Sequence, residues 1–191
     1  TRGGKFKRLE EVITQAINGA KEAIESKNPD LKNQDEVAKA VGIGAIIFND
    51  LKNEKHLDID FNLENMLKFE GQTGPYLQYS SVRIASILKD NTLDINDIDA
   101  SYYKEDDYFE LIKLLGQFPY IVERAMDHNA PNLIARYIIG LAQGFNSFYG
   151  KHRINVEESK QLNANLLFVE SIRTVINEGL RLLGIQALNE M

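Results

Sequence analysis

The sequence predicts an all-α protein built as a bundle of amphipathic helices. Over most of its length, apolar residues recur at intervals of three and four positions, which places them on one side of a helix. The 4 prolines stand where these segments begin, end or divide. Strict alternation of apolar and polar residues, which is typical of a strand, occurs in one short segment, Leu57–Phe61.

The composition is that of an ordinary globular protein, with 43% hydrophobic and 26% charged residues among 191. No apolar run approaches the roughly 20 residues that cross a bilayer, so we expect no membrane segment. The absence of cysteine excludes disulfides and thiolate metal sites and agrees with a cytoplasmic location. The net charge of −6 argues against non-specific nucleic-acid binding, but it is compatible with a local basic face.

Two helices are predicted before residue 52. The first covers Leu9–Ser26, and the Asn-Pro-Asp sequence at 28–30 ends it. The second starts at Asn33 or Asp35 and continues to about Leu51. Its Gly-Ile-Gly sequence resembles the start of a dinucleotide-binding loop, but Ile47 stands where the third glycine belongs and no strand precedes it. We therefore interpret Gly42 and Gly44 as positions of close helix packing.

A polar loop with a short strand is predicted at residues 52–62. Asp58 and Asp60 share one face of the alternating segment, but no third ligand stands nearby, so we predict no metal site. His56 is interpreted as a solvated loop residue. Asn62 is a candidate N-cap for a short helix that leads to Phe69.

The segment Phe69–Arg83 combines a turn, a helix start and two tyrosines. Thr73 can cap a helix that extends to about Lys89, and Pro75 fits its first turn. At about 100° per residue, Tyr76, Tyr79 and Arg83 share one side. Two phenol rings beside a guanidinium could stack with nucleic-acid bases. Periodicity alone favours the rim of an ordinary core, and Arg83 could equally pair with an acid on another helix.

The remaining chain predicts a polar connector and then further helices. Helical spacing resumes at about Asp106, and Pro119 should kink or split this helix because it removes a backbone hydrogen bond. Another helix runs from Pro131 to Gly150, and the last from about Glu157 to Leu183. Gly184 suits a left-handed cap that lets Ile185 fold back on Leu180.

The end of the Pro131 helix is a second candidate for RNA contact. Tyr149 precedes Lys151, His152 and Arg153, and an aromatic ring beside cations could contact a base and a phosphate. A charged surface loop explains the same residues, so both interpretations stay open. No partner for His152 as a general base is evident.

Several of these stretches resemble the arginyl-tRNA synthetase family. The string Phe-Glu-Gly-Gln-Thr-Gly-Pro-Tyr-Leu-Gln-Tyr at 69–79 is similar to the family's junction between catalytic and anticodon-binding domains. The Val-Gly-Ile-Gly-Ala helix, the Leu-Leu-x-x-Phe-Pro sequence before Val122 and the ending at 184–191 also resemble family stretches. The resemblance implies that 1–70 is a mostly helical C-terminal remnant of the class I catalytic domain and that 71–191 is the helical anticodon-binding bundle.

The resemblance also implies functional residues. Those expected to bind the anticodon region of tRNA-Arg are Tyr76, Gln78, Tyr79, Arg83, Tyr149, Arg153 and Met191. The glycine-rich start resembles the end of the family's ATP-binding loop, which implies ATP contacts for Arg2, Gly3 and Gly4. Composition alone favours a flexible terminus there. No catalytic or metal-binding residue is expected within these 191 residues.

Because the sequence does not begin with methionine, we expect a fragment of a longer enzyme. The resemblance implies that the full-length parent activates arginine with ATP and Mg²⁺ and transfers it to tRNA-Arg. The fragment is expected to be monomeric and inactive and to keep weak affinity for tRNA. The alternatives are a helical protein-interaction adaptor without RNA binding, an unrelated helical enzyme, or the anticodon domain of another class I synthetase.

Overall fold

A computed structural model describes residues 8–59 and 61–191 of the chain. Every regular element in this part is a helix, which confirms the all-α prediction. The elements are α1 (Leu9–Lys27), α2 (Gln34–Leu51), α3 (Leu63–Met66), α4 (Gly74–Lys89), the 3₁₀ helix η1 (Ala100–Lys104), α5 (Asp106–Gly116), α6 (Phe118–Asp127), α7 (Pro131–Lys151) and α8 (Ser159–Leu182). No helix in the described ranges is both long and apolar enough to span a bilayer.

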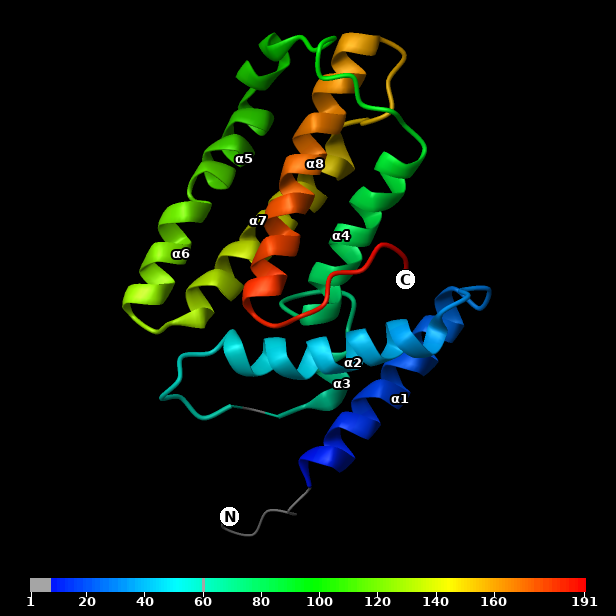
Figure 1. The fold of residues 1–191 in the computed structure, drawn as a ribbon, viewed down its shortest axis with the longest axis vertical. Coiled ribbons are helices and arrows are strands. Elements are labelled where there is room, and N and C mark those ends of the chain that lie inside the picture. The colour runs from blue at the N-terminus through cyan, green and yellow to red at the C-terminus, as the bar shows by residue number, and fades with distance from the viewer. Residues whose placement is uncertain (1–7, 60) are drawn as a thin grey trace.

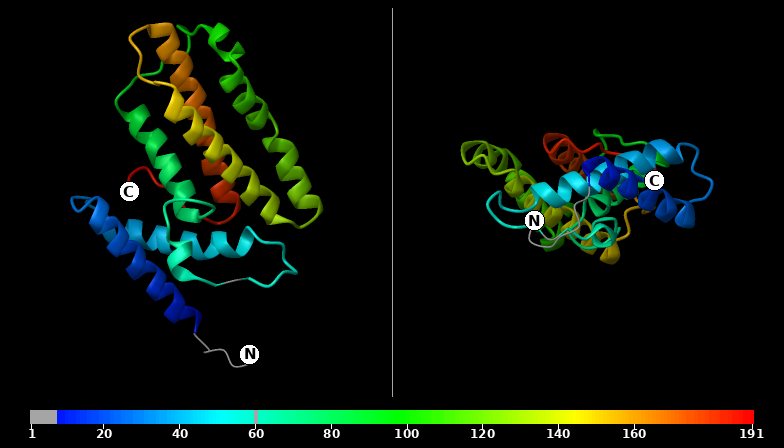
Figure 2. Two further views of the ribbon diagram at one scale, coloured as in Figure 1. Left: turned by 180° about the vertical axis from the view of Figure 1, so that it is seen from behind. Right: turned by 90° about the horizontal axis from the view of Figure 1, so that it is seen from below.

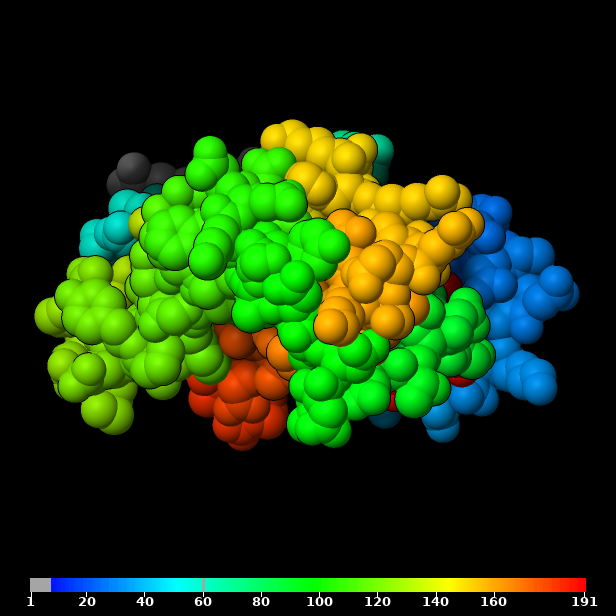
Figure 3. All heavy atoms as spheres, turned by 90° about the horizontal axis from the view of Figure 1, so that it is seen from above, coloured from blue at the N-terminus to red at the C-terminus, as the bar shows by residue number. Residues whose placement is uncertain are grey.

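The helices form an upright bundle that stands on a pair of crossing helices. Helices α4, α7 and α8 pack against one another, and α5 and α6 lie along the outer side of α7 (Figure 1). Helix α2 crosses beneath the bundle and contacts α4 and α7, while α1 packs on α2 from below. The view from behind shows α7 between α4 and the α5–α6 pair (Figure 2). The upper end is closed where the connector after α4 meets the start of α8 (Figure 3).

Two apolar clusters hold this arrangement together. The larger fills the upright bundle, and its fully buried side chains include Phe48, Leu77, Ile138, Phe145 and Ile172. The smaller lies around α1 and α2 and contains Ile24 and Val41, together with Val82 from α4 and Leu188 from the C-terminal tail. The tail therefore joins the crossing helices to the bundle.

The predicted helix boundaries are confirmed where local chemistry sets them. The Thr73 hydroxyl accepts a hydrogen bond from the Tyr76 N–H at 3.1 Å, as expected of an N-cap. Pro119 divides the predicted long helix, because α5 ends at Gly116 and α6 begins at Phe118. Gly184 adopts φ 74°, and the Ile185 N–H donates to the Leu180 carbonyl at 2.9 Å.

The prediction of a strand at Leu57–Phe61 is wrong for the residues that the structure describes. These residues lie in a loop between α2 and α3, and Leu57, Ile59 and Phe61 are 54%, 40% and 48% exposed. A strand needs a neighbouring strand to satisfy its backbone groups, and none is formed in the described ranges. Alternation of apolar and polar residues therefore does not produce a strand here, because no neighbouring strand is present in the described ranges.

The small residues of α2 allow the close packing that the sequence predicts. A Cβ atom at Gly42 would lie 2.7 Å from the Ile17 backbone nitrogen of α1. One at Gly44 would lie 3.1 Å from the Ile185 side chain and 3.2 Å from that of Gln78. At the other side of the contact, a Cβ at Gly74 would lie 2.6 Å from the Gly44 carbonyl oxygen.

We expect Gly42→Ala to lower the free energy of unfolding by about 1–3 kcal/mol, because the added methyl must push apart two backbones. Gly140→Ala is the matched control, since Gly140 lies inside α7 with open space around its Cα. It should stabilise the helix by about 0.5–1 kcal/mol. Urea unfolding of both variants measures the difference, and equal stability of the two would contradict the packing interpretation.

Candidate nucleic-acid interface

Helices α4 and α7 bring a guanidinium between two exposed tyrosine rings. The Arg83 Cζ atom lies 4.9 Å from the centroid of the Tyr79 ring and 5.5 Å from that of the Tyr149 ring. Tyr79 is 37% exposed and Tyr149 is 40% exposed. The Phe69 ring makes an edge contact with the Tyr79 ring, with their centroids 6.2 Å apart. We call Phe69, Tyr79, Arg83 and Tyr149 the aromatic strip.

Asn146 on α7 holds the strip from beneath. Its side-chain oxygen accepts a hydrogen bond from an Arg83 terminal nitrogen. Its amide nitrogen lies 2.9 Å from each of three acceptors, the Tyr76 hydroxyl, the Ser80 hydroxyl and the Ala142 carbonyl. Tyr76 is therefore half-buried and tied to α7 through its hydroxyl, while the ring of Tyr79 stays exposed.

The sequence interpretation missed Asn146, although a signal was available. It precedes Tyr149 by three positions, so both residues lie on one side of a helix. Nothing in the sequence showed that this side of α7 faces Arg83, because that depends on how two distant helices pack.

Gln78 lies on a different side of α4 and is fully buried, at 0% exposure. Its amide nitrogen donates to the carbonyl oxygens of Gln186 at 2.8 Å and Ala40 at 3.3 Å. It thereby connects α4 to the C-terminal tail and to α2. Burial excludes Gln78 from direct contact with RNA in this structure, so its predicted role is corrected to that of a residue that positions the tail.

Met191 is half-buried beside the smaller apolar cluster. Its backbone carbonyl accepts a hydrogen bond from the Asn28 side chain at 3.2 Å. Two residues earlier, the Asn189 side chain accepts one from Arg173 on α8 at 2.5 Å. The end of the chain is thus attached both to α8 and to the loop after α1.

Arg153 is exposed and lies on the loop that follows α7. Two backbone carbonyls of this loop are hydrogen-bonded to α8. The Asn165 amide of α8 donates to the Ile154 carbonyl at 2.9 Å and to the Arg153 carbonyl at 3.4 Å. The Tyr108 hydroxyl donates to the Asn165 oxygen at 2.7 Å. Burial raises the pKa of Tyr108 to about 12, so the phenol keeps its proton and acts as a donor.

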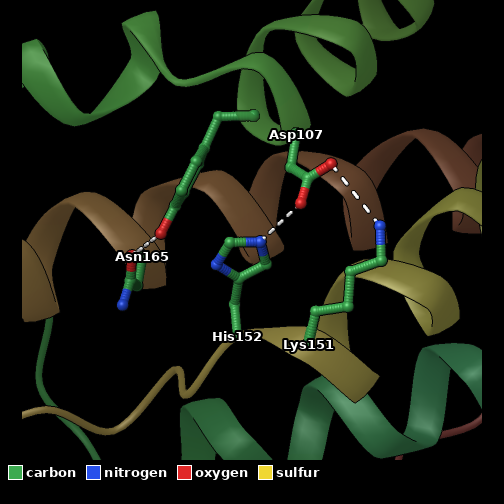
Figure 4. A network of polar contacts seen from close by, with 5 residues as sticks. Asp107, Lys151, His152 and Asn165 are labelled. Atoms are coloured by element: carbon green, nitrogen blue, oxygen red, sulfur yellow. Dashed lines mark hydrogen bonds and ion pairs between the residues drawn. The ribbon is translucent and has the colours of Figure 1, made fainter.

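The carboxylate of Asp107 contacts both basic residues that precede Arg153, Lys151 and His152. In Figure 4, Asp107 of α5 reaches toward both His152 and Lys151. Its oxygens lie 2.8 Å from His152 Nε2 and 3.7 Å from Lys151 Nζ. The hydrogen bond from His152 holds the pKa of Asp107 below its ordinary value, and the charge of Lys151 acts in the same direction. The ring of His152 also stacks on Phe148 at 4.3 Å.

Of the three basic residues that follow Gly150, Arg153 is the one that has no carboxylate contact among the described residues. Neither Arg153 nor Arg83 has a carboxylate within 4.0 Å among the described residues. Arg83 is thus held by an amide and two rings rather than by an acid of the described residues, which argues against the acid pairing that the sequence left open.

The predicted ATP contacts Arg2, Gly3 and Gly4 lie outside the described residues, as does Asp60. Within residues 8–59 and 61–191, no group of three or more His, Cys, Asp or Glu side chains is placed to hold a metal ion.

Comparison with known proteins assigns the bundle to a family. Residues 77–191 match the family model described as the DALR anticodon binding domain. The chain belongs to this family. The DALR match includes the whole aromatic strip except Phe69, and it also includes Asn146. The preceding part, residues 1–63, matches a second model, described as the catalytic domain of class I (R) tRNA synthetases.

Relatives of this DALR-domain chain carry the name arginine–tRNA ligase. "Arginine--tRNA ligase 2" of Bacillus anthracis is 48% identical over 191 residues, and the arginine–tRNA ligase of Exiguobacterium sibiricum is 45% identical over 192. Both alignments cover 100% of this chain but 34% of the relative. The chain therefore spans about a third of the length of these curated relatives.

Solved structures show the same arrangement of helices. The arginyl-tRNA synthetase of Thermus thermophilus superposes with a TM-score of 0.93 at 31% identity, over 99% of this chain and 34% of that one. The Plasmodium falciparum enzyme superposes with a TM-score of 0.83 over 96% of this chain and 34% of its own. At 22% identity, this second match supports the fold alone.

We expect Asn146→Ala to destabilise the domain by about 1–3 kcal/mol, because it leaves the groups beneath the strip without their shared partner. Gln143→Ala is the control, since Gln143 is exposed on the same helix. Urea unfolding followed by circular dichroism measures both. Equal unfolding midpoints would show that Asn146 does not hold α4 to α7.

Asp107→Asn should lower stability at neutral pH and not at low pH. Because the folded-state pKa of Asp107 is lowered, its contribution is fully present above the unfolded value of about 3.9 and is lost as pH falls through the folded value. Asp106→Asn controls for charge in the first turn of α5. Thermal unfolding between pH 7 and about pH 2 tests this, and superimposable curves for the two variants would refute it.

Proposed function

We propose that this chain binds the anticodon loop of an arginine-accepting tRNA through the aromatic strip. The observation that carries the proposal is the guanidinium of Arg83 between two exposed tyrosine rings, in a chain that belongs to an anticodon-binding family. Unstacked loop bases are recognised by stacking on aromatic rings and guanidinium planes, together with hydrogen bonds to base edges. The strip supplies both kinds of surface.

Each proposed contact residue has a distinct role. Tyr79 and Tyr149 offer ring faces to bases, and Arg83 offers a planar cation between them. Arg153, which is exposed and has no acid partner among the described residues, contacts phosphate. Met191 provides an apolar contact at the end of the tail. Tyr76 contributes its half-buried ring from the base of the strip.

We infer that the whole protein joins arginine to tRNA-Arg with ATP and Mg²⁺ and that catalysis lies outside the described helices. The names of the relatives and the class I catalytic match over residues 1–63 support this. We accordingly divide the chain into 1–70, the end of a catalytic domain, and 71–191, the anticodon-binding domain. Arg2, Gly3 and Gly4 are proposed to contact ATP, and the protein is proposed to be a cytoplasmic monomer.

Two competing functions predict different behaviour. The anticodon domain of a synthetase for another amino acid would prefer another tRNA, whereas the relatives named above support arginine. A helical adaptor would bind a protein through an exposed apolar surface, and Tyr120 and Met126 on α6 are 59% and 70% exposed. Such an adaptor would have no affinity for tRNA.

The proposal is tested by titrating a tRNA-Arg transcript, and one altered in its anticodon, with the 191-residue chain. We expect Tyr79→Ala and Tyr149→Ala each to weaken binding by about 1–3 kcal/mol, roughly fivefold to 150-fold, because each removes a stacking surface. The altered transcript should bind the wild type less tightly.

Tyr120→Ala is the matched control for these variants. Tyr120 is also an exposed tyrosine beside an arginine, with Arg124 Cζ 5.7 Å from its ring centroid, but it lies on α6 away from the strip. It should leave affinity unchanged. Equal binding of both transcripts by all four proteins would eliminate the anticodon function.

A further inference from the structure

The aromatic strip continues beyond the DALR match onto the first helix of the chain. The Lys27 ammonium lies 4.6 Å from the centroid of the Phe69 ring, and Phe69 in turn contacts Tyr79. A continuous series of contacts thus runs from Lys27 at the end of α1 through Phe69, Tyr79 and Arg83 to Tyr149 at the end of α7. Lys27 and Phe69 both precede residue 77, where the DALR match starts.

An independent contact brings the same lysine toward the end of the chain. Asn28, the next residue, donates its side-chain hydrogen bond to the Met191 carbonyl at 3.2 Å. Phe69 and Met191 also pack on the same apolar cluster. Lys27 is therefore connected to Tyr79 through Phe69 and to Met191 through its neighbour Asn28, although neither Tyr79 nor Met191 is near it in sequence.

The charge of Lys27 is uncompensated at short range. Lys27 is exposed, and no carboxylate of the described residues lies within 4.0 Å of its ammonium. Lys21 on the same helix is different, because it pairs with Asp35 at 2.6 Å and this pairing raises its pKa. In a chain with net charge −6, an unpaired cation beside an aromatic surface favours an anionic ligand at that place.

We propose that Lys27 binds a backbone phosphate of the RNA strand whose bases lie on Tyr79 and Met191. A lysine ammonium is a compact charge that suits a phosphate. The RNA-binding surface is then composite, built from the DALR bundle and from the end of α1. This inference rests on the proposed anticodon function and adds to it a contact that is independent of base identity.

A phosphate contact has a recognisable signature. Losing it weakens binding of every tRNA equally and reduces the dependence of affinity on salt, because one fewer counterion is released. For single-stranded nucleic acid the slope of log K against log salt changes by about 0.7 per contact, which corresponds to roughly fivefold at 0.1 M salt. A base contact instead changes the preference between transcripts.

The test measures affinity for the tRNA-Arg transcript, and for its anticodon variant, across a salt series. We expect Lys27→Gln to weaken both complexes roughly fivefold at 0.1 M salt. The fall of log K with log salt should also become less steep, by about 0.7. Lys27→Arg should retain the wild-type slope, because it keeps the charge. Lys21→Gln removes a lysine of the same helix that is already paired, so it should leave the slope unchanged.

Tyr79→Ala separates failure of this inference from failure of the proposed function. If Tyr79→Ala weakens binding while Lys27→Gln matches the wild type in affinity and slope, the anticodon function stands and the role of Lys27 is overturned. A slope change of equal size in Lys21→Gln would overturn it too, because the effect would then be one of net charge. If neither Tyr79→Ala nor Lys27→Gln weakens binding, the proposed function fails and this inference fails with it.

Discussion

The arrangement of the whole chain depends on the close approach of α2 and α4. A Cβ atom at Gly74 would lie 2.6 Å from the Gly44 carbonyl oxygen, so the first turn of α4 sits directly on the middle of α2. Interiors this closely packed transmit position from one element to the next. Because α1 packs on α2 in turn, the contact determines where the end of α1 stands relative to the bundle. Lys27 at the end of α1 contacts Phe69 of the aromatic strip for this reason.

Different sides of α4 pack against α2, α7, α8 and the C-terminal tail, and the remaining side leaves Tyr79 exposed. Gln78 faces α2 and the C-terminal tail, and Ser81 donates to Asn177 of α8 at 2.6 Å. Tyr76 is tied to α7 through Asn146. Tyr79 remains between the side that meets α7 and the side that meets the tail, where no helix covers it, which is why its ring is available.

The distribution of charge explains how an acidic chain can offer a basic contact surface. Some of the basic residues of the bundle contact a carboxylate, as Lys151 and His152 do with Asp107 and as Arg181 does with Glu178. Lys27 and Arg83, which lie on or beside the proposed RNA surface, contact aromatic rings and an amide instead. Net charge describes the sum of these groups, whereas binding depends on the charges that face the ligand.

The sequence by itself determined the helices and most of their ends, because capping and chain termination depend on a few neighbouring residues. The Thr73 cap, the break at Pro119 and the left-handed Gly184 are local effects of this kind. Helical spacing also grouped Tyr76, Tyr79 and Arg83 correctly. Only the tertiary structure decided that Gln78 is buried, that Asn146 supports the strip and that Lys27 extends it. These outcomes depend on which side of each helix meets another, and that is set by packing between residues far apart in sequence.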